Sequence, residues 1–132
     1  MSPAPQIRGS SPILLVADVV KAVAYYEKKL GFKTPRLWGD PPMFAIPRRD
    51  GFEVMLNQVA KGDSFRPNAS YDGRYDAYFY VADADGLYAE FAANGADIVC
   101  PPDDQPYGMR ELQVRDLDGH LLALGHDISG QA

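Results

Sequence analysis

The chain has 132 residues, of which 46% are hydrophobic, and carries a formal net charge of −5 with a pI near 4.8. This length suits one folded domain over residues 1–132 with its own hydrophobic core. The acidic balance argues against a nucleic-acid partner, because phosphates require a basic surface. No apolar stretch reaches the roughly 20 residues that span a membrane. Cys100 is the only cysteine and no secretory signal precedes the domain, so we expect a cytoplasmic protein without disulfides.

The first half of the chain, residues 11–58, is expected to form the order βαβββ. Asp18 is a good helix N-cap, and the apolar spacing after it predicts a helix with one buried face. Gly31 supplies the left-handed residue that ends many helices. Prolines 41 and 42 and the Asp50-Gly51 turn separate the strands that follow. The expected strands cover residues 13–17, 33–39, 43–47 and 52–58.

The second half repeats this order after a polar linker over residues 59–74. Val16-Ala17-Asp18 returns as Val81-Ala82-Asp83, and apolar residues occupy the same helix positions after both aspartates. Repetition at a fixed spacing indicates two copies of one module. The second module, residues 75–126, is expected to contain a helix over 83–94. Its expected strands cover residues 76–81, 97–100, 109–115 and 120–125.

Three motifs carry a family resemblance. The first helix has Tyr25-Tyr26 followed by Leu30-Gly31-Phe32, and the last hairpin has Gly108-Met109-Arg110-Glu111 and Asp116-Leu117-Asp118-Gly119. These motifs resemble the vicinal oxygen chelate superfamily, which includes glyoxalase I, extradiol dioxygenases and bleomycin-resistance proteins. The likeness covers residues 12–126. It implies an α+β fold in which two βαβββ modules form curved sheets around a cleft, with the helices outside.

The resemblance also implies positions for four metal ligands, one on the first and one on the last strand of each module. In this chain those positions hold Ser11, Met55, Asp76 and Ala123. Only Asp76 is a useful donor, because a thioether and a methyl group offer a hard divalent ion nothing. We therefore expect no metal and no other cofactor, although Glu53 or Asn57 could belong to a shifted site. His120 is expected to cap or solvate its turn, and His126 to be a surface residue.

The cleft is predicted from the alternation of side chains along strands. The expected ligand-binding residues are Trp38, Phe44, Glu53, Met55, Asp76, Tyr78 and Tyr107. Residues of the opposite faces, such as Leu14, Leu56 and Leu122, are expected to pack under the helices. Aromatic walls and carboxylates suit a planar or cationic organic ligand. Arg110 and Glu111 are interpreted as a structural ion pair in preference to ligand contacts.

The favoured hypothesis is sequestration of a small organic molecule such as an antibiotic, of the kind the bleomycin-resistance members perform. Two alternatives stay open. One is a metal-dependent lyase, isomerase or dioxygenase, and the other is a metal-free enzyme with Asp76 or Glu53 as general base. No catalytic residue is assigned. The resemblance further implies a homodimer in which modules of two chains close each cleft, and two-fold dimers are the commonest oligomers.

Overall fold

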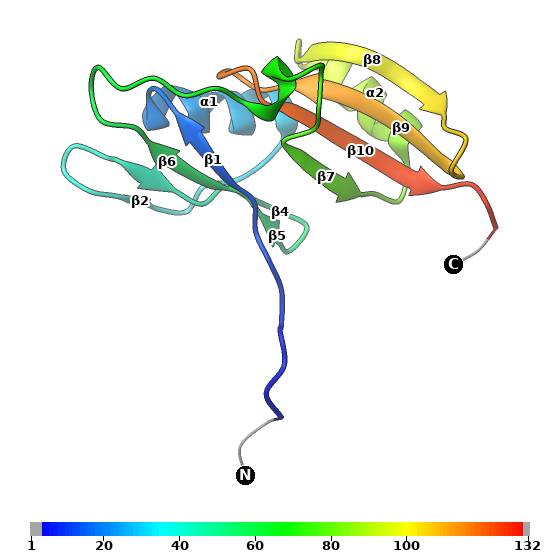
Figure 1. Cartoon of the computed structure of the whole chain (residues 1–132), viewed down its shortest axis with the longest axis horizontal. Coiled ribbons are helices and arrows are strands. Elements are labelled where there is room, and N and C mark those ends of the chain that lie inside the picture. The colour runs from blue at the N-terminus through cyan, green and yellow to red at the C-terminus, as the bar shows by residue number, and fades with distance from the viewer. Residues whose placement is uncertain (1–3, 131–132) are drawn as a thin grey trace.

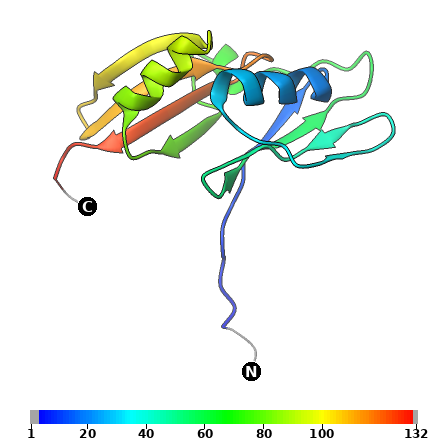
Figure 2. The same ribbon diagram turned by 180° about the vertical axis from the view of Figure 1, so that it is seen from behind.

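The computed structural model describes residues 4–130, which form two four-stranded sheets (Figure 1). The sheets are curved and open. Both α-helices lie on the same side of the sheets, and neither covers the other side, as the front and back views show (Figures 1 and 2). This arrangement confirms the predicted α+β class with two strand-and-helix modules. Residues 1–3 and 131–132 of the predicted domain lie outside the described residues.

The first sheet has the strand order β1-β6-β3-β2, and β1 and β6 are parallel. Its strands are β1 (Ile13–Val16), β6 (Met55–Gln58), β3 (Phe44–Ala45) and β2 (Leu37–Trp38). Helix α1 (Val19–Leu30) begins after Asp18, whose carboxylate accepts a 3.1 Å hydrogen bond from the amide of Lys21. It ends at Gly31, which has a φ of 74°. Both caps of this helix are as predicted.

Three predicted strands of the first half differ from the observed ones. The strand expected over 33–39 is reduced to β2, because Lys33 pairs only with Arg48 and a proline follows it at position 35. The strand over 43–47 is reduced to β3. The strand over 52–58 is divided at Val54 into β6 and β5 (Phe52–Glu53), and β5 forms a separate hairpin with β4 (Arg48–Arg49).

The second sheet has the order β7-β10-β9-β8. Its strands are β7 (Ala77–Tyr80), β10 (Leu121–Asp127), β9 (Met109–Arg115) and β8 (Asp97–Asp104). Helix α2 (Ala84–Ala93) is capped by Asp83, and a short 3-10 turn, η1 (Asn68–Ser70), lies in the linker. The prediction that β8 ends at Cys100 was wrong. The strand continues through Pro101-Pro102 because β8 is at the sheet edge, where the missing amide donors of proline cost no ladder bond.

The core lies between the sheets and the helices. The predicted inward residues Leu14, Val16, Leu56 and Leu122 are buried there with the apolar face of α1. Side chains of α1 also join the two modules, since Tyr26 donates a hydrogen bond to Asp116 in the β9–β10 turn. No helix within residues 4–130 is long and apolar enough to cross a membrane.

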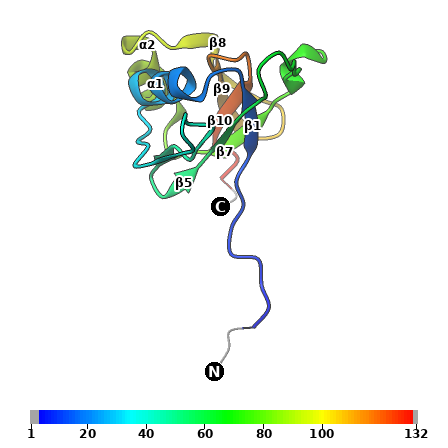
Figure 3. The ribbon, with the colours of Figure 1, turned by 90° about the vertical axis from the view of Figure 1, so that its left-hand side faces the viewer.

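The N-terminal arm, residues 4–10, stretches away from both sheets (Figure 3). All of its residues are exposed, and Ile7 keeps 92% of its surface accessible. Burial of an apolar side chain is favourable, so the exposure of Ile7 means that the arm does not pack on the rest of residues 4–130.

Candidate functional site

The uncovered face of the first sheet carries aromatic and apolar side chains. One row crosses all four strands through Leu15, Asn57, Phe44 and Trp38. The rings of Trp38 and Phe44 have their centroids 5.7 Å apart, and the guanidinium of Arg36 lies 4.8 Å from the Trp38 ring. Met55 and Ile13 form the neighbouring row on the same face. The structure thus brings together Trp38, Phe44 and Met55, three of the predicted ligand-binding residues.

A buried carboxylate surrounded by tyrosines lies on the uncovered face of the second sheet. Glu111 of β9 is 1% exposed. It accepts hydrogen bonds from the hydroxyls of Tyr78 at 2.6 Å, Tyr107 at 2.7 Å and Tyr75 at 3.2 Å. The ring of Tyr80 lies 5.1 Å from that of Tyr78, centroid to centroid. We call Tyr75, Tyr78, Tyr80 and Tyr107 the tyrosine cluster.

The three tyrosine hydroxyls around Glu111 stay protonated and can therefore donate hydrogen bonds to it. Burial, reinforced by the hydrogen bond and the charge of Glu111, raises the pKa of Tyr78 and Tyr107 far above the ordinary 10.0 of a phenol. The pKa of Tyr75 is raised for the same reasons, with burial first. An ionised carboxylate is an acceptor-only group, so three phenol donors match its chemistry.

Sequence reasoning missed Glu111 as the centre of this site. The expected ion pair between Arg110 and Glu111 is wrong, because successive residues of β9 point to opposite faces. Arg110 instead pairs with Asp85 and Asp104, both at 2.9 Å. The alternation of buried Leu112 and Val114 with Glu111 and Gln113 was the signal that could have placed Glu111 on the uncovered face.

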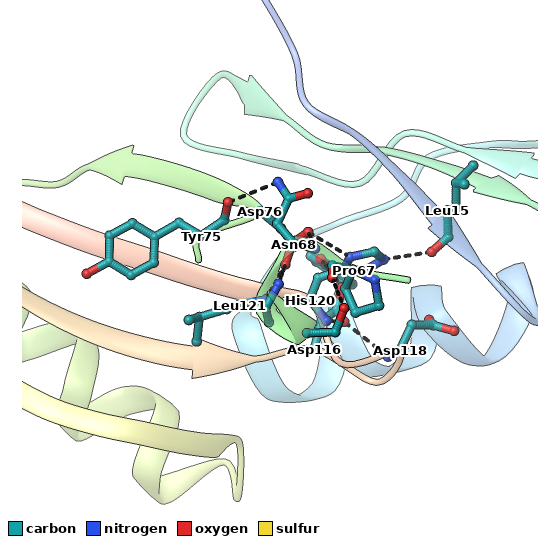
Figure 4. A network of polar contacts seen from close by, with 12 residues as sticks. Leu15, Pro67, Asn68, Tyr75, Asp76, Asp116, Asp118, His120 and Leu121 are labelled. Carbon is teal, nitrogen blue, oxygen red and sulfur yellow. Dashed lines mark hydrogen bonds and ion pairs between the residues drawn. The ribbon is translucent and has the colours of Figure 1, made fainter. Parts of the chain in front are cut away.

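Asp76 connects the linker between the modules to the second sheet through hydrogen bonds of its carboxylate (Figure 4). Its carboxylate accepts hydrogen bonds from the amides of Asn68 at 2.6 Å and Leu121 at 2.8 Å, and more weakly from Ala69 at 3.3 Å. Its side chain is 5% exposed. These bonds tie the linker to the start of β10. Nδ1 of the buried His120 ring lies 3.4 Å from Oδ1 of Asp76, so the carboxylate oxygens face backbone amides and this ring.

The side chains of both histidines contact backbone groups within the fold. His120 is buried, which corrects the expectation of a solvated turn residue (Figure 4). Its Nε2 lies 2.7 Å from the carbonyl oxygen of Leu15, and the ring of Phe65 stacks on it. His120, directly before β10, therefore connects the second module to β1 of the first. Nδ1 of His126 accepts a 2.8 Å hydrogen bond from the amide of Ala84 at the start of α2.

Glu53 lies on the β4–β5 hairpin, which is separate from the two four-stranded sheets. Its carboxylate accepts a 3.1 Å hydrogen bond from Ser11 and lies 3.4 Å from Nε of Arg48. A hollow near this hairpin is lined by Glu27, Lys33, Thr34, Pro35, Arg48, Arg49, Asp50 and Gly51. It contains no aromatic ring, and the aromatic groups gather on the uncovered sheet faces instead.

The four positions implied for metal ligands do not fit a divalent ion. Asp76 is committed to backbone amides, and Ala123 is fully buried and has no donor atom. Met55 offers a thioether, which binds hard divalent ions poorly. Across residues 4–130, no three His, Cys, Asp or Glu side chains are grouped closely enough to hold a metal. The donor set thus disagrees with a shared metal centre at these positions.

Comparison with known proteins agrees with this architecture. The model of the Glyoxalase/Bleomycin resistance protein/Dioxygenase superfamily matches residues 10–124, and the chain belongs to this superfamily. No curated protein matches the chain.

Among solved structures, TioX from Micromonospora sp. ML1 is similar, with 27% identity, a TM-score of 0.68, and coverage of 90% of this chain and 99% of that one. A glyoxalase-related enzyme from Clostridium phytofermentans has 18% identity and a TM-score of 0.75, over 96% of this chain and 100% of that chain. UcmS2 has 20% identity and a TM-score of 0.70, over 90% and 98% respectively. At these low identities, the last two structures show only that the fold is similar.

Proposed function

We propose that this chain is a small-molecule-binding protein that holds a planar or cationic organic ligand against the uncovered faces of its sheets. The observation that carries the proposal is the gathering of aromatic side chains there, Trp38 and Phe44 on one sheet and the tyrosine cluster on the other. Stacking and cation–π contacts with such rings contribute about 0.5–2 kcal/mol each. Sequestration of an antibiotic is one form that this binding would take.

Binding is favoured over catalysis by the state of Asp76 and Glu53, the two carboxylates that the sequence suggested as a general base. A general base needs an oxygen free to reach the proton it removes. The oxygens of Asp76 accept three backbone hydrogen bonds, and Glu53 is engaged by Ser11 and Arg48. Each oxygen of these two carboxylates thus already has a partner within residues 4–130, which favours binding over the enzymatic alternative.

Trp38 is the only tryptophan, so its fluorescence provides a direct binding assay. Titration with N-methylquinolinium, a planar aromatic cation, should quench the emission of Trp38 in a saturable way. Free tryptophan amide under the same conditions is the control for collisional quenching. Quenching that stays linear and matches the free amide would contradict the proposal.

We also propose that the ligand is bound without a metal ion, because the four implied ligand positions offer no adequate donor set. Protein purified without chelator should contain well under one equivalent of transition metal per chain. A chelator should leave its thermal unfolding unchanged. Stoichiometric iron, zinc, nickel or manganese, lost together with the folded structure on chelation, would support the metal-dependent alternative instead.

A homodimer is the third part of this proposal. The uncovered sheet faces expose Ile13 at 62% and Tyr80 at 85%, and the N-terminal arm exposes Ile7. The two sheets of one chain lie side by side with their uncovered faces on the same side, so a second copy is needed to enclose a ligand (Figure 1). Light scattering should give about twice the 14.5 kDa mass of one chain. A single-chain mass that persists on tenfold concentration would refute the dimer.

A further inference from the structure

Glu111 is a buried negative charge with no positive partner in the described part of the chain. The neighbouring cation, Arg110, is held on the opposite face of β9 by Asp85 and Asp104. Within residues 4–130, the side-chain groups that contact the Glu111 carboxylate are three tyrosine hydroxyls. A buried carboxylate is costly unless it is both hydrogen-bonded and paired with an opposite charge. The hydroxyls supply the hydrogen bonds, and the pairing charge is still missing.

The tyrosine rings extend this charge toward solvent. A phenol that donates to a carboxylate is polarised by it, and its ring becomes a better partner for a cation. Tyr107 and Tyr80 are 60% and 85% exposed, so parts of the cluster are accessible from outside. Adjacent rings are tilted by 54° and 55° between Tyr75 and Tyr78 and between Tyr78 and Tyr80. Because the rings are tilted and not parallel, the faces of more than one ring can contact the same cation.

Gly125 of β10 makes this arrangement possible. It lies opposite Tyr80 on one side and opposite Glu111 on the other. A Cβ atom at this position would overlap the hydroxyl of Tyr78 and lie 3.0 Å from Cγ of Glu111. The absence of a side chain therefore lets the Tyr78 hydroxyl reach the carboxylate.

From this geometry we propose that the tyrosine cluster, with Glu111 behind it, is a subsite for a substituted ammonium group on the ligand. The inference rests on the proposed function and names the chemical group that the second sheet recognises. A quaternary or tertiary ammonium has no strongly hydrated N–H₃ head, so it leaves water for aromatic faces at low cost. The positive charge of the ammonium group would then lie close to the negative charge of Glu111, with the tyrosine rings between them.

The test uses choline and its neutral isostere, 3,3-dimethyl-1-butanol, in NMR titrations of the full chain. The two molecules have nearly the same shape and differ in one charge. Wild-type protein should bind choline about tenfold more tightly than the alcohol, as expected for a cation–π site backed by a carboxylate. The shifted signals should be those of the tyrosine cluster and Gly125.

Two variants and a control define the role of the charge. Glu111→Gln keeps the size of the side chain and should lower the ratio of choline to alcohol affinity several-fold, to about two to three, because the rings remain and only the charge behind them is removed. Tyr80→Ala removes a highly exposed ring, which spares the fold, and should lower choline affinity about fivefold. Tyr71→Phe, on the surface beside Arg66, should change neither ligand's affinity.

Equal affinities of the wild-type protein for choline and the alcohol, or no saturable choline binding, would overturn the ammonium subsite. An unchanged ratio of choline to alcohol affinity in Glu111→Gln would also overturn it. If that variant does not fold, unchanged choline affinity in Tyr80→Ala would decide against the subsite. Saturable quenching of Trp38 by N-methylquinolinium would still support the proposed function in each of these cases. The two hypotheses can therefore fail separately.

Discussion

Replacing Tyr26 by phenylalanine tests the contact that joins the two modules. Tyr26 is fully buried on α1, and its hydroxyl donates a 2.8 Å hydrogen bond to Oδ2 of Asp116. A hydrogen bond to a charged group contributes about 1.5–3 kcal/mol, and one between neutral groups about 0.5–1.5 kcal/mol. Because the variant leaves a buried carboxylate with one donor fewer, we expect the free energy of unfolding to fall by about 2–3 kcal/mol at pH 7.

This loss should be smaller at low pH. Burial raises the pKa of Asp116 above its ordinary 3.8, while the Tyr26 hydrogen bond acts in the opposite direction. A carboxyl group with a higher pKa in the folded state binds more protons when folded, so its contribution to stability falls as pH rises from the ordinary to the raised value. Removing the Tyr26 hydroxyl raises the folded pKa further. The penalty is therefore complete at a pH above the raised folded-state pKa, and it shrinks as the pH falls through that pKa toward 3.8, because Asp116 then becomes protonated in both folded proteins.

Urea unfolding at pH 7 and pH 4 measures both effects. Tyr25→Phe is the control, because the hydroxyl of Tyr25 donates at 2.7 Å to the carbonyl oxygen of Arg115 and accepts at 3.0 Å from the amide of Asp97, so both of its hydrogen-bond partners are neutral backbone groups. The control should lose about 0.5–1.5 kcal/mol at either pH. A loss in Tyr26→Phe that equals the control, or that does not change with pH, would refute the assignment of an ionised Asp116 as its partner.

Three further changes test the site and the fold. Trp38→Ala should weaken binding of N-methylquinolinium by about 1–3 kcal/mol in calorimetry with little loss of stability, and unchanged affinity in a destabilised variant would place Trp38 outside the site. Gly125→Ala should displace the Tyr78 hydroxyl, lower the free energy of unfolding by about 1–3 kcal/mol and weaken choline binding. An unfolding free energy equal to that of the wild type would show that the backbone of β10 shifts to accommodate the methyl group. Arg49→Met removes the 2.6 Å ion pair with Glu90 and should cost about 1 kcal/mol at low salt, less at high salt, in thermal unfolding. A loss independent of salt would assign the effect to packing.

The repeated modules and their buried faces could be predicted from the sequence because they depend on local spacing. Asp18 and Gly31 bound α1 as expected, since caps act within one helical turn. The alternation along β1 and β10 placed Leu14 and Leu122 in the core, because successive strand residues point to opposite faces. The same alternation placed Met55 and Tyr78 on the uncovered faces.

What only the tertiary structure decided is which distant groups meet. Asp76 was expected to contact a ligand, but the linker folds back and gives its carboxylate the amides of Asn68 and Ala69. Pro101 and Pro102 were expected to end β8, but whether a proline breaks a strand depends on whether that strand is at the sheet edge. The partners of Glu111 lie from 4 to 36 residues away in the chain. Hydrogen bonds over such separations depend on strand register and on the space left at Gly125, and neither is a local property of the sequence.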